Sequence, residues 1–314
     1  MSTMNSTMYL YSVQERYADA FAKNFTIVVL AVTILSINGV FVLTFFRSSI
    51  FYSDPRYILY IHLVLNDMLM VFISVILFMM AYVWQNVPLP FCVILLIIAS
   101  TTHKNTPLTL AGMAVERYVA ICKPLHHHQI CTVRRTYILI SLIWGVGVLP
   151  GLSDLILLSI VRPLSIFSTA TSCGASILYS TPYHEVQSRF MNGLYSSVVW
   201  VILVFTYCQV LIAARRATND KSSAKKAQNT ILLHGAQLLL CMLSYITAVI
   251  DKMFVPLIPV DRARLTFFNY LLTNILPRLL TPLIYGVRDK HFYNHMKGLF
   301  SCRLFIVKVE AIKQ

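Results

Sequence analysis

Charged residues are scarce in this sequence of 314 residues. They make up 12% of it, whereas a soluble domain carries about 25% charged residues. Hydrophobic residues make up 57%, and they come in long blocks rather than in the stripes of a soluble helix. The chain therefore lacks the polar surface that a soluble globular protein needs, and that class is excluded.

Motifs of the common enzyme classes are absent as well. The sequence has no glycine-rich phosphate loop, no HExxH zinc motif and no GxSxG nucleophile motif. It has no internal repeat and no low-complexity tract, and the polar residues 1–23 do not form a cleavable signal peptide. We expect neither an enzyme nor a bound cofactor.

Seven long apolar blocks dominate what is present. Each is close to the ~20 residues that cross a hydrocarbon core, and backbone in lipid must satisfy its own hydrogen bonds, so the blocks should be helices. We place the spans at 24–46, 57–83, 91–122, 136–160, 191–215, 227–253 and 265–286. The predicted fold is an all-α membrane protein, a seven-transmembrane helix bundle that crosses the plasma membrane several times.

Basic residues set the orientation of this bundle. Most of the 26 lysines and arginines lie on one side if the N-terminus is outside and the C-terminus inside, as the positive-inside rule requires. The net charge of +14 therefore indicates topology and contact with the lipid bilayer, and we expect no nucleic-acid partner. We divide the chain into an extracellular segment 1–23, a seven-transmembrane domain 24–286 and a cytoplasmic tail 287–314 with a short amphipathic helix.

Two features of the predicted outer side fit this orientation. Of seven cysteines, only Cys92 and Cys173 fall on the oxidising side, so we predict a disulfide between them; two unpaired surface thiols are the alternative. Asn5 begins an Asn-Ser-Thr acceptor sequon in the outer segment and predicts a glycoprotein. Asn24 also begins a sequon, but it abuts the first span.

The most specific stretch of the sequence is MAVERYVAICKPLH at 113–126. It resembles the odorant-receptor signature MAYDRYVAICKPLHY and lies at the inner end of the third span, where that family has it. Shorter matches follow the family order across about residues 25–300: Asn38 in the first span, Leu65-Asn66-Asp67 in the second, Trp144 in the fourth, Tyr207 in the fifth and Pro282-Leu283-Ile284-Tyr285 at the end of the seventh.

Several positions depart from the family pattern. Thr281 stands where the family has asparagine, and Pro277-Arg278 replaces a pair of prolines. The aromatic FYG motif of the sixth span is missing, and the outer loop has one cysteine where many members have three. These departures indicate a divergent member of the family, of the fish type.

The resemblance implies a G-protein-coupled receptor for olfaction and sensory transduction. Its partners would be a small-molecule odorant and a stimulatory olfactory heterotrimeric G protein that raises cyclic AMP. In the family, the arginine at Arg117 is held at rest by its acidic neighbour, here Glu116, and meets the G protein in the active state. Tyr118, Tyr207 and Tyr285 would complete this coupling region. Simple interfacial anchoring is the alternative role for the arginine and the tyrosines.

An acid in the middle of the second span, Asp67, predicts an internal polar site, because a buried carboxylate in a membrane span is costly and usually functional. In related receptors this position helps to bind sodium, and the helix face that bears Thr281 lines the sodium cavity. We predict that Asn38 belongs to the same internal polar site. Arg278 precedes Thr281 by three residues and so shares its helix face. We predict that Arg278 replaces the ion.

A lysine in the third span, Lys104, is the least expected residue of the sequence. Ser100, His103 and Lys104 share one helix face, which lines the ligand pocket in the family. A lysine there needs a counter-charge or water. Two possibilities stay open: the ligand carries an anionic or hydrogen-bond-accepting group, or Lys104 pairs internally with Asp154 or Asp251.

Two minor features complete the prediction. The histidine run 126–128 is not expected to bind a metal ion, because adjacent helical residues point in different directions. Cys302 in the tail is either palmitoylated or a plain thiol.

Two other functions are alternatives to an odorant receptor. The first is a non-olfactory receptor of the same superfamily, and the extended VAICKPLH match to the odorant-receptor signature argues against it. A transporter or channel would show repeat symmetry and broken helix pairs, and the sequence shows neither.

Overall fold

The computed structural model describes residues 2–83, 86–161, 164–171, 173, 182–216, 267–282 and 291–298. Its elements are α1 Ser2–Arg47, η1 Ser49–Ser53, α2 Pro55–Val83, β1 Val87–Pro88, α3 Leu89–Cys122, η2 Pro124–His126, α4 His127–Ile130, α5 Val133–Val161, η3 Leu164–Ser168, β2 Ala170–Thr171, α6 Pro182–Arg216, η5 Leu271–Ile275 and α9 Leu276–Pro282. Residues 291–298 form a further helix. The predicted sixth span, with Asp251, lies outside the described residues, as do Tyr285 and Cys302.

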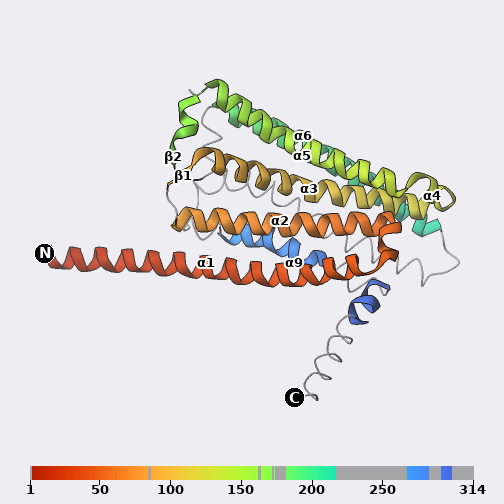
Figure 1. The fold of residues 1–314 in the computed structure, drawn as a ribbon, viewed down its shortest axis with the longest axis horizontal. Coiled ribbons are helices and arrows are strands. Elements are labelled where there is room, and N and C mark those ends of the chain that lie inside the picture. The colour runs from red at the N-terminus through yellow and green to blue at the C-terminus, as the bar shows by residue number, and fades with distance from the viewer. Residues whose placement is uncertain are drawn as a thin grey trace, which may run out of the picture.

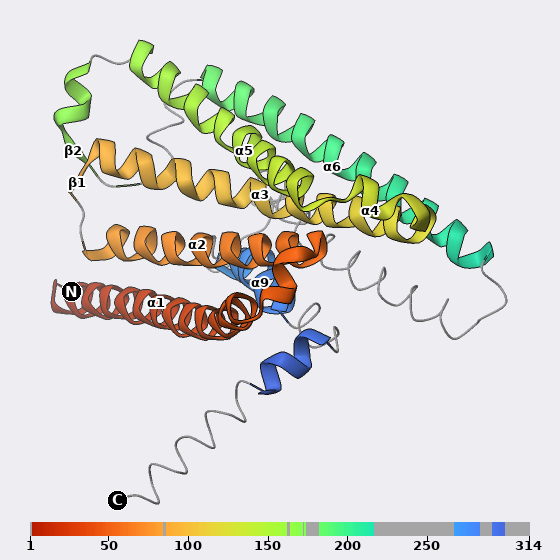
Figure 2. The ribbon, with the colours of Figure 1, turned by 45° about the vertical axis from the view of Figure 1, so that its right-hand side comes forward.

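The long helices run side by side, with α3 in the middle of the bundle (Figures 1 and 2). α3 packs against α2, α5 and α6, while α1 and α9 pack against each other and against α2. Apart from two short strands, the regular elements of the described residues are all helices. The all-α prediction is therefore confirmed for this part of the chain.

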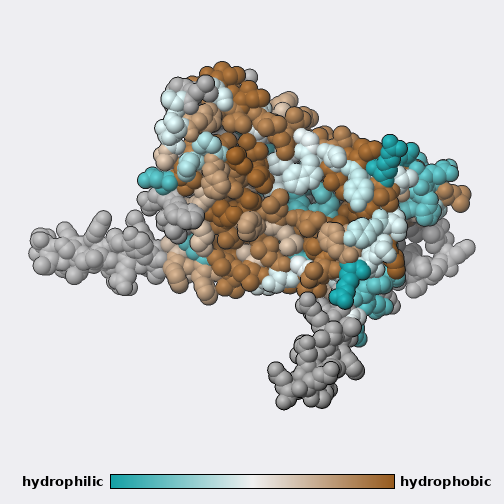
Figure 3. Space-filling model, in the orientation of Figure 1, coloured by the Kyte–Doolittle hydropathy of each residue, from teal (hydrophilic) through white to brown (hydrophobic). Residues whose placement is uncertain are grey.

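Four described helices contain stretches long and apolar enough to cross a membrane: Asp19–Arg47, Pro55–Met80, Val133–Val161 and Arg189–Ala213. Large hydrophobic side chains such as Phe72, Ile160 and Val201 are exposed on them. Hydrophobic residues cover much of the face in Figure 3, and hydrophilic residues gather near α4. Such a surface is costly in water and favourable in lipid, as the sequence predicts.

The central helix α3 is long enough to cross the bilayer but carries many buried polar groups, among them Thr102, Asn105 and Thr109. Polar groups in a membrane span are tolerated where they face protein rather than lipid. The position of α3 between α2, α5 and α6 therefore explains its composition, and the functional clusters described below lie along it.

Helix bounds are where the sequence prediction was least accurate. α1 begins at Ser2 and α6 at Pro182, whereas the apolar blocks predicted starts at 24 and 191. Apolar residues mark the part of a helix that lies in lipid, but helical hydrogen bonds continue into polar sequence beyond it. Asn5 therefore lies on the helical backbone of α1, and Asn24 lies within the apolar stretch Asp19–Arg47.

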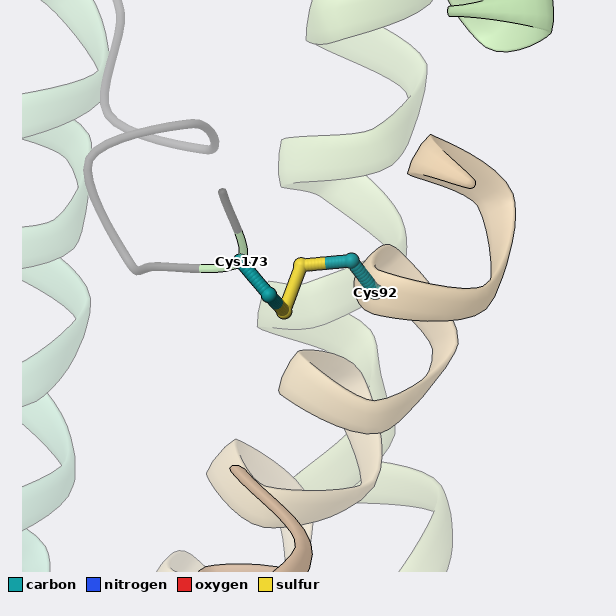
Figure 4. The surroundings of a disulfide bond; sticks show 2 residues. All are labelled: Cys92 and Cys173. Atoms are coloured by element: carbon teal, nitrogen blue, oxygen red, sulfur yellow. A yellow bond between two sulfur atoms is a disulfide. The ribbon is translucent and has the colours of Figure 1, made fainter. Parts of the chain in front are cut away.

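One end of the bundle, which we call the disulfide end, holds the bond between Cys92 of α3 and Cys173 of the α5–α6 connection (Figure 4). The predicted disulfide is thus confirmed. β1 and β2 pair antiparallel beside it, with Val87 opposite Thr171. The N-terminal end of α1 projects beyond this end of the bundle (Figure 1).

The opposite end, which we call the α4 end, holds η1, η2, α4 and helix 291–298. Phe292 of that helix is 1% exposed and packs against Phe41 of α1 and Phe51 of η1, with ring centroids 5.6 and 5.1 Å apart. The first inter-helix turn and the C-terminal helix are therefore joined by aromatic packing.

Candidate functional site

Three polar clusters follow one another along α3. The first is nearest the disulfide end and centres on Lys104, whose ammonium donates to the Ser100 hydroxyl at 2.9 Å. Lys104 is only 9% exposed, and the negative charge of Asp154 on α5 acts on it. The hydroxyl of Tyr195 on α6 donates to the Lys104 backbone carbonyl. The predicted residues Ser100 and Lys104 are thus in contact, and α5 and α6 complete their surroundings.

His103 completes the predicted ligand-binding set. It is half-buried, and the positive charges of Arg278 and Lys104 both act on it. Beside this cluster, Gln187 of α6 donates to Ser153 of α5 at 2.7 Å. The cluster offers one cation and several hydrogen-bonding groups, so it can bind an anion or a strong acceptor if that group competes with Asp154 for Lys104.

The second cluster surrounds the carboxylate of Asp67, which is 1% exposed. Thr106 of α3 donates to Asp67 Oδ1 at 2.9 Å, and Thr281 of α9 donates to Oδ2 at 3.3 Å. Asn66 donates in turn to the Thr106 hydroxyl at 3.0 Å. These bonds join α2, α3 and α9 around one charge.

Arg278 supplies the counter-charge to Asp67. Its Nε lies 3.9 Å from Asp67 Oδ1, and both side chains are almost fully buried. Its Nη1 donates to the Asn274 carbonyl, and its Nη2 lies 2.6 Å from the sulfur of Met70. Asn38 is also fully buried, but its amide makes no hydrogen bond with the described residues. Of the predicted internal site, Asp67, Arg278 and Thr281 are in contact, whereas Asn38 makes no hydrogen bond with them.

The sequence prediction missed the π-helical segment η5, Leu271–Ile275, which directly precedes α9. Pro277 follows it and has no backbone N–H, so it cannot donate to the preceding turn. A single π turn is a common way to absorb such a disruption and is frequent at functional sites. The Arg278 side chain satisfies the Asn274 carbonyl within this irregular turn.

The third cluster lies at the α4 end, around the buried carboxylate of Glu116. Arg117 Nε lies 3.7 Å from Oε2 of Glu116, and His127 Nε2 lies 3.1 Å from Oε1. Burial and the nearby Glu116 charge raise the pKa of the Cys131 thiol, although Arg135 opposes them. The predicted Glu116–Arg117 pair is thus present, and His127 is a second partner that the sequence analysis did not single out.

The predicted tyrosines of the coupling region differ in their surroundings. Tyr118 packs edge-on against Phe205 of α6, with ring centroids 5.8 Å apart, and so connects α3 to α6. Tyr207 is half-buried on α6. Tyr285 lies outside the described residues.

A buried histidine on α2, His62, is a further residue that the sequence analysis missed. Trp144 of α5 donates to His62 Nε2 at 2.9 Å, so that nitrogen accepts and the ring proton is on Nδ1. Nδ1 lies 3.2 Å from the Thr109 hydroxyl, which donates to the Asn105 carbonyl. The chain of bonds joins α2, α3 and α5. A polar residue inside an apolar span was the signal that could have identified it.

These clusters do not resemble a metal site built from three or more side chains. In the part of the chain that the structure describes, no three histidine, cysteine or acidic side chains are placed to hold one ion together.

This chain resembles known receptors, in one case over almost its full length. Residues 37–285 match the family described as 7 transmembrane receptor (rhodopsin family). Odorant receptor 131-2 of Danio rerio is 31% identical over 313 residues, which cover 99% of this chain and 95% of that receptor. Olfactory receptors 4K3 and 4K1 of Homo sapiens are each 29% identical, over 61% and 58% of this chain and 60% and 58% of their own lengths. The chain therefore belongs to the rhodopsin family of seven-transmembrane receptors and, within it, to the odorant receptors.

Proposed function

We propose that this receptor binds a small-molecule odorant in the disulfide-end half of its bundle and then activates a stimulatory olfactory heterotrimeric G protein. Cyclic AMP would be the signal that results. The observation that carries the proposal is the full-length similarity to an odorant receptor, together with the Glu116–Arg117 pair at the end of α3. A guanidinium keeps its charge and can exchange one acceptor for another, which suits a residue that leaves Glu116 for a G protein.

The orientation that we propose places the disulfide end outside the cell and the α4 end in the cytoplasm. A disulfide forms and persists on an oxidising side of the membrane. Arg134 and Arg135 lie at the α4 end, at the start of α5, where the positive-inside rule expects basic residues. Odorant would then reach the Lys104 cluster from outside, and the Glu116 cluster would meet the G protein.

The finer part of the proposal concerns the ligand, which we infer to carry a carboxylate or a strong acceptor that meets Lys104. Ser100 and His103 would add hydrogen bonds. Asp154 is the internal competitor, because its charge acts on the same ammonium. A carboxylate on the ligand that displaces Asp154 from Lys104 gains charge-assisted hydrogen bonds in a site largely shielded from water.

The test is a ligand screen with a cyclic-AMP readout in cells that express the olfactory G protein, with carboxylic acids matched to their methyl esters. Acids should act at about tenfold lower concentration than esters, because a charge-assisted bond contributes about 1.5 kcal/mol or more. Lys104→Met should abolish that difference, and Asp154→Asn should increase acid potency.

The outcomes separate the two parts of the proposal. If esters act as well as acids, or if Lys104→Met leaves acid potency unchanged, Lys104 is structural and the odorant is neutral. If no odorant raises cyclic AMP in a receptor that reaches the cell surface, the proposed coupling itself is wrong.

A further inference from the structure

Two histidines stand one turn apart on helix 291–298 at the α4 end. The ring centroids of His291 and His295 are 4.7 Å apart, and the ring planes are inclined by 33°. His291 is exposed and His295 is half-buried. Residues four apart lie on the same face of a helix, so both rings project from one side. None of the three clusters along α3 includes this pair.

The hydrogen bond of His295 fixes which of its nitrogens can bind a ligand. Its Nδ1 lies 2.9 Å from the His291 carbonyl oxygen. A carbonyl can only accept, so the proton is on Nδ1 and the Nε2 of the neutral ring keeps its lone pair. Histidines that bind metal ions are commonly held this way, with the other ring N–H donated to a backbone carbonyl.

We propose that His291 and His295 form a binding site for a divalent transition-metal ion, with water completing the coordination. Two imidazoles bound to one ion, with metal–nitrogen bonds of about 2.1 Å and near-tetrahedral angles, have ring centres roughly 5 Å apart. The observed separation of 4.7 Å is close to that value. Imidazole ligands suit zinc and copper, whereas magnesium and calcium prefer oxygen, so the site takes ions of the first kind.

Aromatic packing holds the two rings in place. Phe51 of η1 is fully buried, and its ring meets His291 and His295 edge-on with centroids 6.0 and 5.3 Å apart. Phe292 anchors the same helix against Phe41. The ion therefore meets a pair whose backbone and rings are already positioned, while the exposure of His291 leaves a path from solvent.

Metal binding would stabilise this end of the receptor. An ion that bridges two successive turns adds a link within the helix, and it does so beside the packing against η1. Ions that bind only the folded protein raise its stability in proportion to the logarithm of their concentration.

The test uses the full receptor, purified in detergent without a polyhistidine tag, with Zn²⁺ as the probe. Equilibrium dialysis measures the ion bound per receptor, and a thermal melt measures its effect on stability. The matched variant is the double substitution Y293H/H295Y, which keeps the number of histidines but places them two residues apart on different helix faces. His128→Ala controls for the exposed histidine of α4.

We expect the tightest Zn²⁺ site to weaken by about tenfold or more in Y293H/H295Y, as for lost metal ligands or their supports. The Zn²⁺-dependent rise in melting temperature should disappear with it, and His128→Ala should retain both. If the double variant melts early without metal, His291→Asn serves as the second test. Unchanged Zn²⁺ affinity in a folded variant, or no saturable Zn²⁺ binding in the unmodified receptor, overturns the proposal.

Discussion

At the scale of single residues, one buried carboxylate has two partners. Glu116 lies 3.7 Å from Arg117 Nε and 3.1 Å from His127 Nε2. Adjacency in the sequence made the first contact predictable. The second depends on how η2 and α4 turn back beside the end of α3, and no spacing rule for a regular helix predicts that return.

Arg117→Ala should abolish odorant-driven cyclic AMP while the receptor still reaches the cell surface. The substitution removes the guanidinium that pairs with Glu116, and with it the charge that we assign to G-protein contact. Arg134→Ala, at an exposed position on α5, is the control and should signal normally. A normal response in Arg117→Ala would rule out the assigned role.

His127→Phe should raise signalling in the absence of odorant. A hydrogen bond to an ionised carboxylate contributes about 1.5–3 kcal/mol, so its loss should weaken the resting arrangement around Glu116 roughly tenfold or more. His127→Gln keeps an N–H donor and should behave closer to the unmodified receptor. The measurement is basal cyclic AMP per receptor at the surface. Equal basal activity in all three proteins would show that His127 does not stabilise the resting state.

At the scale of elements, the Asp67–Arg278 pair joins α2 to α9 inside the bundle. The pair is nearly fully buried, and Thr106 and Thr281 satisfy both carboxylate oxygens. Removing one member of such a pair leaves an uncompensated charge and costs about 3–5 kcal/mol, so Arg278→Ala is expected to destabilise the receptor strongly. We propose that the same guanidinium takes the place of a bound cation that would otherwise neutralise Asp67.

Agonist affinity should therefore be insensitive to sodium at constant ionic strength. Arg278→Asn, which removes the charge but retains hydrogen-bonding groups, should restore part of a sodium response. Binding of one agonist is measured with sodium exchanged for a large organic cation. A clear sodium effect on the unmodified receptor would contradict the assignment of Arg278.

At the scale of the whole molecule, orientation decides which cluster meets odorant and which meets the G protein. The two ends differ in covalent chemistry and polarity, because the disulfide lies at one end and hydrophilic residues gather near α4 at the other. Asn5 and Asn24 lie on the same helix, but only Asn24 is inside the apolar stretch Asp19–Arg47.

Asn5→Gln should remove the glycan from the receptor, since we place this end of α1 outside the cell. Enzymatic removal of N-linked glycans should increase gel mobility for the unmodified receptor and for Asn24→Gln, but not for Asn5→Gln. Enzymatic glycosylation requires an acceptor in an accessible surface segment. An unglycosylated receptor at the cell surface would refute the proposed glycan at Asn5.

The sequence by itself determined the class of fold, the disulfide and the family, because these follow from local properties. Long apolar blocks must be helices in lipid, and only Cys92 and Cys173 fell on the predicted outer side. Apart from the Asp67–Arg278 pair, which the sequence predicted, tertiary structure decided which polar groups of different helices meet. Trp144 donates to His62 of a different helix, and the charge of Asp154 acts on Lys104, for which the sequence had left two possible partners open. Which polar groups approach each other depends on the rotation of each helix and on its depth in the membrane. The apolar residues that face lipid constrain neither quantity tightly enough to select a partner.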